Sequence, residues 1–176
     1  MTFYQIICLI LFSFSSVFAT GAIAQNQRLT ENLTISRNVI VTRVSDGDSL
    51  RSGKLRIRLF GIDAPEKNQI CVNKNNESYN CGSISTQELK KYVGREKIKC
   101  RYTEKDRYGR ILGTCYFPYD SSKLSLNRYM VYTGHAVAYK RYSEKYLDSE
   151  KWAKDNHLGM WQGNFERPEK WRTKYK

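Results

Sequence analysis

Acidic residues are in the minority in this 176-residue sequence: 17 Asp and Glu stand against 30 Lys and Arg, so the formal net charge is +13 at pH 7. Lys and Arg side chains that neutralise phosphates release counterions, which favours binding to a polyanion. The shortage of acids therefore indicates nucleic acid or an anionic membrane surface as the partner. A protein that is simply basic and soluble is the alternative.

Charged side chains are absent from residues 1–24, and residues 3–18 are mostly apolar. This composition is typical of a signal peptide, and Ala22 and Ala24 supply the small residues of a cleavage site. No Lys or Arg precedes the apolar run, so an uncleaved membrane anchor is the alternative. Cleavage after Ala24 would place the protein outside the cell or in the periplasm. The remaining chain is then expected to form a flexible lead-in (25–36), one domain (37–162) and a basic tail (163–176).

Cysteine spacings typical of zinc sites are also missing. Cys8 lies in the apolar N-terminal segment, and no C-x-x-C pair occurs among the other four, which are Cys71, Cys81, Cys100 and Cys115. The histidines, His135 and His157, lie far from them in sequence, which argues against a zinc site. In an exported chain, four such cysteines favour two disulfides, with three possible pairings.

The chain has no internal repeat and no low-complexity block. Apolar alternation predicts strands over residues 39–44, 54–62, 96–102 and 110–117, a short strand ending at Leu50, and another over 135–140. Ser85 and Glu88 have the spacing of a capping box, which predicts a helix over 85–94. Residues 68–82 are expected to be a loop, and two more helices are expected over 124–133 and 143–156. This order indicates an α+β fold built around a small barrel.

The few acids are concentrated in a segment that also carries arginines, at Asp46, Asp48, Asp63 and Glu66. A site that hydrolyses a phosphodiester must shield the phosphate charge, position a water and stabilise the leaving oxygen. The carboxylates of Asp48 and Asp63 suit Ca²⁺, and the guanidinium of Arg58 can hold two phosphate oxygens. Arg110 can do the same, which leaves Glu66 to orient or deprotonate a water. Taken alone, Asp46 and Asp48 could also be ordinary turn residues.

Five short motifs occur in a fixed order: DGDS at 46–49, RLFGIDAPE at 58–66, DRYGR at 106–110, GHAVAY at 134–139 and LGMW at 158–161. Together they make the chain similar to the staphylococcal nuclease (thermonuclease) family over roughly residues 38–161. The resemblance implies a five-stranded OB-fold barrel with three helices and Ca²⁺ as cofactor. It also implies hydrolysis of DNA and RNA without sugar specificity, leaving 3′-phosphate ends.

The same resemblance implies a role for each matching residue. Asp48 and Asp63 would bind calcium through their side chains and Ala64 through its carbonyl. Arg58 and Arg110 would contact the phosphate, and Glu66 would be the general base.

Further positions complete the implied site. Tyr108 and Tyr139 would lie beside the nucleotide, and Asp46 would support the metal site. Ala64 departs from the best-known member, which has Thr there, and Arg141 stands where a second Tyr is expected. The base preference is therefore open.

The two proposed metal ligands are not brought together by a simple hairpin. A tight turn at Ser52 and Gly53 would pair Asp48 with Ile57, and Asp63 would then lie ~20 Å farther along a straight strand. The strand must therefore bend, and Gly61 is the expected position of the bend.

The hairpin around DRYG predicts a disulfide pairing. If the turn is centred between Arg107 and Tyr108, Cys100 and Cys115 lie opposite each other on adjacent antiparallel strands, within disulfide range. Cys71 and Cys81 would then close the Asn-rich loop.

Two other functional classes compete with an enzyme. An OB barrel can bind single-stranded nucleic acid without chemistry, but such a module has no use for several carboxylates facing a phosphate. A cationic membrane-active protein would need a basic amphipathic helix with a clean apolar face, and no segment has that pattern. We therefore expect a monomeric nuclease acting on DNA and RNA without a stable protein partner, and a membrane contact only if the N-terminal segment stays uncleaved.

Overall fold

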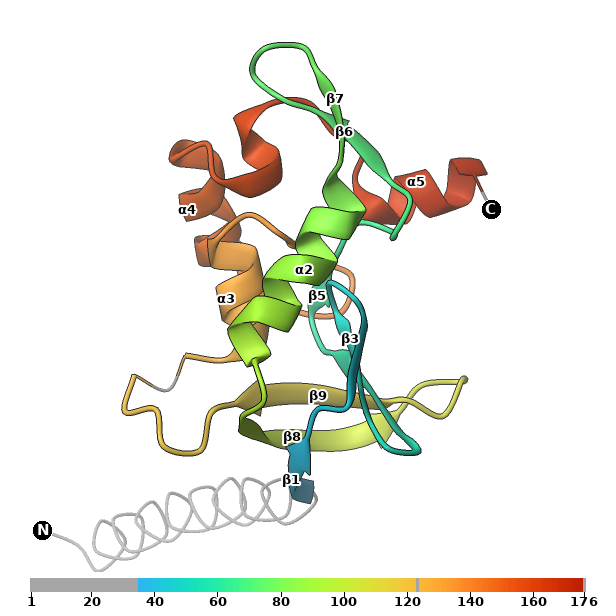
Figure 1. The fold of residues 1–176 in the computed structure, drawn as a ribbon, viewed down its shortest axis with the longest axis vertical. Coiled ribbons are helices and arrows are strands. Elements are labelled where there is room, and N and C mark those ends of the chain that lie inside the picture. The colour runs from blue at the N-terminus through green and yellow to red at the C-terminus, as the bar shows by residue number, and fades with distance from the viewer. Residues whose placement is uncertain (1–34, 123, 176) are drawn as a thin grey trace, which may run out of the picture. The chain divides into compact units, whose positions relative to one another are not determined.

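The computed structural model describes residues 35–122 and 124–175 (Figure 1). The expected signal peptide and nearly all of the expected lead-in lie outside these residues. Within the described part of the chain, no helix combines the length and the apolar character needed to cross a membrane.

A curled six-stranded sheet forms the main framework. Its strand order is β1 (Ile35–Ile40), β8 (Lys97–Lys105), β9 (Ile111–Tyr116), β4 (Leu55–Leu59), β3 (Ser49–Ser52) and β2 (Arg43–Asp46). The β4–β9 pair is parallel, whereas β2–β3, β3–β4 and β8–β9 are antiparallel. One face carries the core residues Leu50, Ile57, Ile98 and Ile111, all of which are fully buried. The predicted α+β class and OB-like architecture are confirmed.

The predicted register of the β3–β4 hairpin is wrong by two residues. Leu50, not Asp48, lies opposite Ile57, and Ser52 lies opposite Leu55. The turn is therefore centred on Gly53 and Lys54, and Gly53 adopts a φ of +56°, which favours glycine. As a result the Asp48 carbonyl accepts a hydrogen bond from the Leu59 amide at 2.8 Å.

The predicted bend at Gly61 is confirmed. Gly61 has a φ of +76°, and the chain leaves the main sheet directly after it. The short strand β5 (Ile62–Asp63) then pairs with β10 (Val137–Ala138), with Asp63 opposite Val137. The bend carries Asp63 back toward Asp48.

Among the residues that the structure describes, four α-helices and one 3₁₀ helix accompany the sheets: α2 (Cys81–Val93), α3 (Leu126–Tyr132), α4 (Leu147–Asp155), η1 (Gly159–Gln162) and α5 (Pro168–Tyr175). The Ser85–Glu88 capping box is wrong, because α2 begins earlier and its N-cap is Asn80, whose side chain accepts from the Ser83 amide. Ser85 instead lies inside α2, buried, and its hydroxyl donates to the His135 carbonyl. The helix α5 lies in residues 163–176, for which the sequence predicted a basic tail but no helix.

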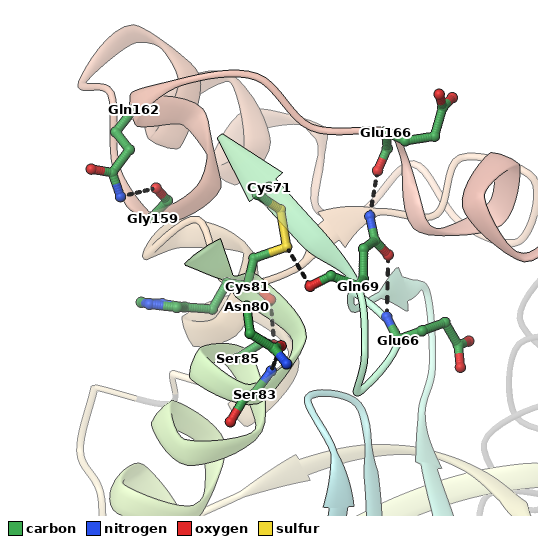
Figure 2. The surroundings of a disulfide bond; sticks show 11 residues. Glu66, Gln69, Cys71, Asn80, Cys81, Ser83, Ser85, Gly159, Gln162 and Glu166 are labelled. Carbon is green, nitrogen blue, oxygen red and sulfur yellow. Dashed lines mark hydrogen bonds between the residues drawn. A yellow bond between two sulfur atoms is a disulfide. The ribbon is translucent and has the colours of Figure 1, made fainter. Parts of the chain in front are cut away.

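A hairpin replaces part of the expected loop over residues 68–82. It consists of β6 (Ile70–Val72) and β7 (Ser78–Asn80) and is closed by the Cys71–Cys81 disulfide (Figure 2). The second disulfide joins Cys100 and Cys115, which lie opposite each other on β8 and β9. Both predicted pairings are confirmed.

Candidate active site

The turn between β2 and β3 presents the first acidic pair. The Asp46 carboxylate accepts a hydrogen bond from the Asp48 amide at 3.1 Å, which fixes the turn. Asp48 is only 2% exposed, and its Oδ2 accepts from the Ala64 amide at 3.0 Å. Gly47 packs so closely against α2 that a Cβ there would lie 1.9 Å from the Ser85 hydroxyl. Close packing therefore explains the glycine between the two aspartates.

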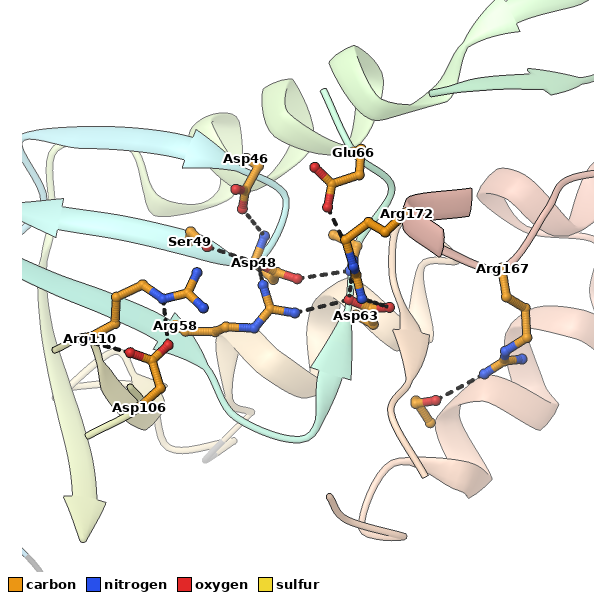
Figure 3. Close-up of polar contacts among 12 residues, drawn as sticks. Asp46, Asp48, Ser49, Arg58, Asp63, Glu66, Asp106, Arg110, Arg167 and Arg172 are labelled. Atoms are coloured by element: carbon orange, nitrogen blue, oxygen red, sulfur yellow. Dashed lines mark hydrogen bonds and ion pairs between the residues drawn. The ribbon is translucent and has the colours of Figure 1, made fainter. Parts of the chain in front are cut away.

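Arg58 connects this turn to β5. Its Nη1 lies 2.7 Å from Asp48 Oδ1, and its Nη2 lies 2.9 Å from Asp63 Oδ1 (Figure 3). Asp63 is 1% exposed, so both carboxylates are buried beside one guanidinium. The structure thus brings together three of the predicted site residues, Asp48, Asp63 and Arg58.

Arg172 on α5 is the site residue that sequence reasoning missed. Its Nη1 donates to Asp63 Oδ1 at 2.9 Å and to Glu66 Oε1 at 3.2 Å, and its Nη2 donates to Asp63 Oδ2 at 2.9 Å (Figure 3). No local motif surrounds it in the sequence. Its only signal was the basic character of the tail.

Glu66 lies on the loop after β5, and the segment preceding α5 helps to hold that loop. The Glu66 amide donates to Gln69 Oε1 at 3.2 Å, and Gln69 Nε2 donates to the Glu166 carbonyl at 2.6 Å (Figure 2). Gln69 is fully buried. Two contacts therefore join the loop of the predicted general base to the C-terminal segment: the Gln69 side chain and the ion pair between Arg172 and Glu66.

Arg110 does not contact the carboxylates that Arg58 binds; it pairs with Asp106 instead. Its Nε lies 2.7 Å from Asp106 Oδ2, and its guanidinium carbon lies 5.5 Å from the centre of the Tyr108 ring. A cavity of about 280 Å³ is lined by Asp46, Ser49, Arg56, Tyr108 and Arg110, among others. The cavity, not a direct contact, therefore connects Arg110 and Tyr108 to the acidic turn.

Tyr139 lies just beyond β10, the strand that pairs with Asp63 and Ile62. Its amide donates to the Gly61 carbonyl at 2.9 Å, and its ring meets that of Tyr142 edge to face at 4.9 Å. Burial, together with Glu169 and Asp63, raises the pKa of its hydroxyl. Arg141 is exposed and reaches to 3.9 Å from Glu169. The structure therefore places the two predicted nucleotide-contacting tyrosines at different parts of the site.

Crowding of the carboxylates is visible in their proton affinities. Burial, and then the neighbouring Asp48 charge, raises the pKa of Asp46 to about 7. Burial also raises the pKa of Asp63, against the opposing hydrogen bonds from Arg172. Both pKa shifts indicate that burial leaves the negative charge of these carboxylates incompletely compensated.

This excess of negative charge fits a divalent cation, and carboxylate oxygens are the ligands that Ca²⁺ prefers. Within residues 35–122 and 124–175, no group of three or more His, Cys, Asp or Glu side chains is arranged to hold a metal ion. The predicted ligand set is smaller than that, with two carboxylates, Asp48 and Asp63, and the Ala64 carbonyl. A cation would therefore rely on water for the rest of its coordination.

Comparison with known proteins supports the same interpretation. Residues 56–163 match the family model described as staphylococcal nuclease homologue. The chain is 33% identical to a protein named micrococcal nuclease from Shigella flexneri over 146 residues, which cover 75% of this chain and 78% of that protein. It is 36% identical to an uncharacterized endonuclease of Escherichia coli over 129 residues, covering 69% and 74% of the two chains.

A third relative carries a name of another kind. The succinoglycan biosynthesis protein ExoI of Rhizobium meliloti is 28% identical over 150 residues, which cover 84% of this chain and 77% of that protein. The family model and the two nuclease-type relatives confirm the resemblance that the motifs suggested. The chain therefore belongs to the staphylococcal nuclease family.

Proposed function

We propose that this protein is a calcium-dependent nuclease that hydrolyses phosphodiester bonds of both DNA and RNA and leaves 3′-phosphate ends. The observation that supports it best is the burial of Asp48 and Asp63 against Arg58, with Glu66 held beside Asp63 by Arg172. A module that only binds nucleic acid gains nothing from burying two carboxylates at considerable desolvation cost.

The chain's own residues divide the work of the reaction. Bound Ca²⁺ would supply charge shielding for the phosphate and a water of lowered pKa. Arg58 and Arg110 would hold two phosphate oxygens and stabilise the charge that develops on them. Glu66 would accept the proton of the attacking water while the bond from phosphorus to the 5′-oxygen breaks. The released 5′-oxygen takes a proton from solvent, and the phosphate stays on the 3′-oxygen.

The substrate path follows from the cavity beside the site. Tyr108 is 55% exposed and lines that cavity, so its ring is available to a nucleotide. Tyr139, which follows the strand paired with β5, would contact the neighbouring nucleotide. The ring faces accept any base by stacking, which agrees with weak sequence preference.

We further propose that the nuclease domain spans residues 37–162 and that the protein is exported and monomeric. The two disulfides support an oxidising compartment. The expected signal peptide would supply the export route.

Incubation of the purified, oxidised protein with single-stranded DNA, duplex DNA and RNA tests the proposal. Each substrate should be degraded when Ca²⁺ is present, and the product ends should be blocked to extension until a 3′-phosphatase removes the phosphate. Binding of all three substrates without product would instead identify a non-catalytic OB-fold module.

A further inference from the structure

The C-terminal helix α5 delivers a positive charge to the centre of the active site. Arg172 contacts both oxygens of Asp63 and one of Glu66 at 2.9 to 3.2 Å, and its side chain is 26% exposed. This helix lies outside residues 56–163, which are the residues matched by the family model. Arg172 therefore reaches the site from a segment that the family model does not cover.

The surrounding segment fixes α5 in this position. Pro168 at the start of the helix is buried, and the Glu166 carbonyl accepts the hydrogen bond from the buried side chain of Gln69. Trp171 is half-buried and packs against Tyr175, with ring centres 5.1 Å apart. The Arg172 contact is thus part of a packed arrangement of the tail.

Each oxygen of the two proposed ligand carboxylates already has an internal donor. Asp48 Oδ1 accepts from Arg58 and Ser49, and its Oδ2 accepts from the Ala64 amide. Asp63 Oδ1 accepts from Arg58 and Arg172, while Oδ2 accepts from Arg172. Arg172 donates to both oxygens of Asp63, so a cation that binds through either oxygen competes with Arg172 for it.

Arg172 is the donor most easily displaced. Arg58 extends from β4 in the middle of the main sheet and also contacts Asp48. Arg172 comes from a short helix of eight residues near the chain end, and its guanidinium contacts only Asp63 and Glu66 among the described ion pairs. Without a second cation the buried carboxylates would be poorly compensated, which is costly.

We propose that Arg172 is a positioning residue that serves as an internal counter-cation: it holds Asp63 and Glu66 together in the metal-free protein and is displaced from Asp63 when a divalent cation binds. The inference rests on the cation site of the proposed function. It implies that Arg172 lowers the affinity for Ca²⁺ while it keeps the two carboxylates ordered in the metal-free state.

Calorimetric titration of the oxidised full chain with Ca²⁺ tests this competition. Arg172→Gln should lower the Kd for Ca²⁺ on the order of 10-fold, because one charge-assisted competitor is removed. Arg172→Lys, which keeps the charge but loses the two-pronged contact, should give an intermediate Kd. Lys170→Gln is the matched control, since Lys170 is exposed on the same helix and its loss changes the net charge equally.

The direction of the change separates competition from a purely structural role. If Arg172 only stabilised the fold, Arg172→Gln would bind Ca²⁺ more weakly than Lys170→Gln or equally well, and either result would overturn the inference. Absence of Ca²⁺ binding in every variant would overturn it too. Should Arg172→Gln fail to fold, the Kd of Arg172→Lys relative to Lys170→Gln decides, with an unchanged or higher value counting against the proposal.

A parallel assay of nucleic-acid hydrolysis distinguishes this inference from the proposed function. Tighter Ca²⁺ binding by Arg172→Gln without hydrolysis by the wild type would support the inference and reject the nuclease. Ca²⁺-dependent hydrolysis by the wild type, with no gain in Ca²⁺ affinity in Arg172→Gln, would support the nuclease and reject the inference.

Discussion

Asp48 and Asp63 contact the two terminal nitrogens of a single guanidinium, at 2.7 Å and 2.9 Å, although they lie on separate elements of the fold. The bend at Gly61 and the pairing of β5 with β10 make this possible. Two carboxylates that are held this close before any ion arrives form a preorganised oxygen site, and the predictions about metal dependence follow from it.

Removal of calcium should abolish hydrolysis. Activity on single-stranded DNA is expected to vanish in a chelator and to return with excess Ca²⁺ but not with Mg²⁺, whose smaller and stricter octahedral shell fits a site of two carboxylates poorly. Asp63→Asn should lose the response to Ca²⁺, because it removes a ligand charge while keeping the shape. Full activity in the presence of chelator would rule out the proposed mechanism.

Loss of either phosphate-binding arginine should slow the chemical step. Arg58→Ala and Arg110→Ala are each expected to lower kcat on the order of 10²-fold, because each removes a contact that strengthens as charge develops on the phosphate. Arg56→Ala, on the same face of β4 as Arg58, should lose far less. Steady-state kinetics on folded variants measures this, and equal losses at all three positions would indicate a general electrostatic effect.

The acidic turn should make stability depend on pH. The pKa of Asp46 is raised to about 7 by burial and by Asp48, so the folded state favours its neutral form. Its contribution to stability is therefore present below the ordinary pKa of an aspartate and is lost as the pH rises through about 7. With chelator present, raising the pH from about 4 to about 7 should lower the free energy of unfolding of the wild type more than that of Asp46→Asn.

Urea unfolding at a series of pH values measures the difference between the two proteins. Asn keeps the oxygen that accepts from the Asp48 amide, so the turn geometry is preserved. Parallel stability curves for wild type and variant would show that Asp46 ionises normally.

The two disulfides should stabilise the fold independently. Replacing Cys100 and Cys115 together by Ser is expected to lower the free energy of unfolding by about 3 kcal/mol on the chain-entropy account, because the crosslink closes a loop of 15 residues. The same change at Cys71 and Cys81 should cost slightly less, since the loop is shorter. Peptide mapping without reductant, on protein taken from its native compartment, should recover both crosslinks, and four free thiols would contradict export.

The parts of the site that could be predicted are those encoded by local patterns. The DGDS turn and the position of Cys100 opposite Cys115 are both found as predicted. The register shifts between Tyr102 and Lys105, however, and Lys105 lies opposite Ile111, so the predicted turn centre between Arg107 and Tyr108 holds for the cysteine pair but not next to the turn.

The β3–β4 register was missed because a glycine with a positive φ fits either central position of a tight turn, and the pairing of Ser52 with Leu55 places Gly53 at the first of them. The start of α2 was missed because the side chain of Asn80 competes with Ser85 for the capping role.

Arg172 could not be predicted for a different reason. Its partners Asp63 and Glu66 lie more than 100 residues earlier in the chain. Periodicity and spacing describe neighbours along the sequence, and a basic tail has many arginines and lysines that could have served. Only the packing of α5 selects one of them.

Gly47 has a consequence for how the protein would respond to mutation. It meets no proposed substrate group, yet any side chain there would collide with Ser85, whose hydroxyl ties α2 to the segment leading into β10. A side chain at this position would push the turn that carries Asp48 away from α2 and from Ala64, which follows Asp63. In a saturation screen scored by activity, Gly47 would therefore appear as intolerant as Asp48 or Asp63, and a ranking of positions by lost activity would place a purely steric residue among the chemical ones.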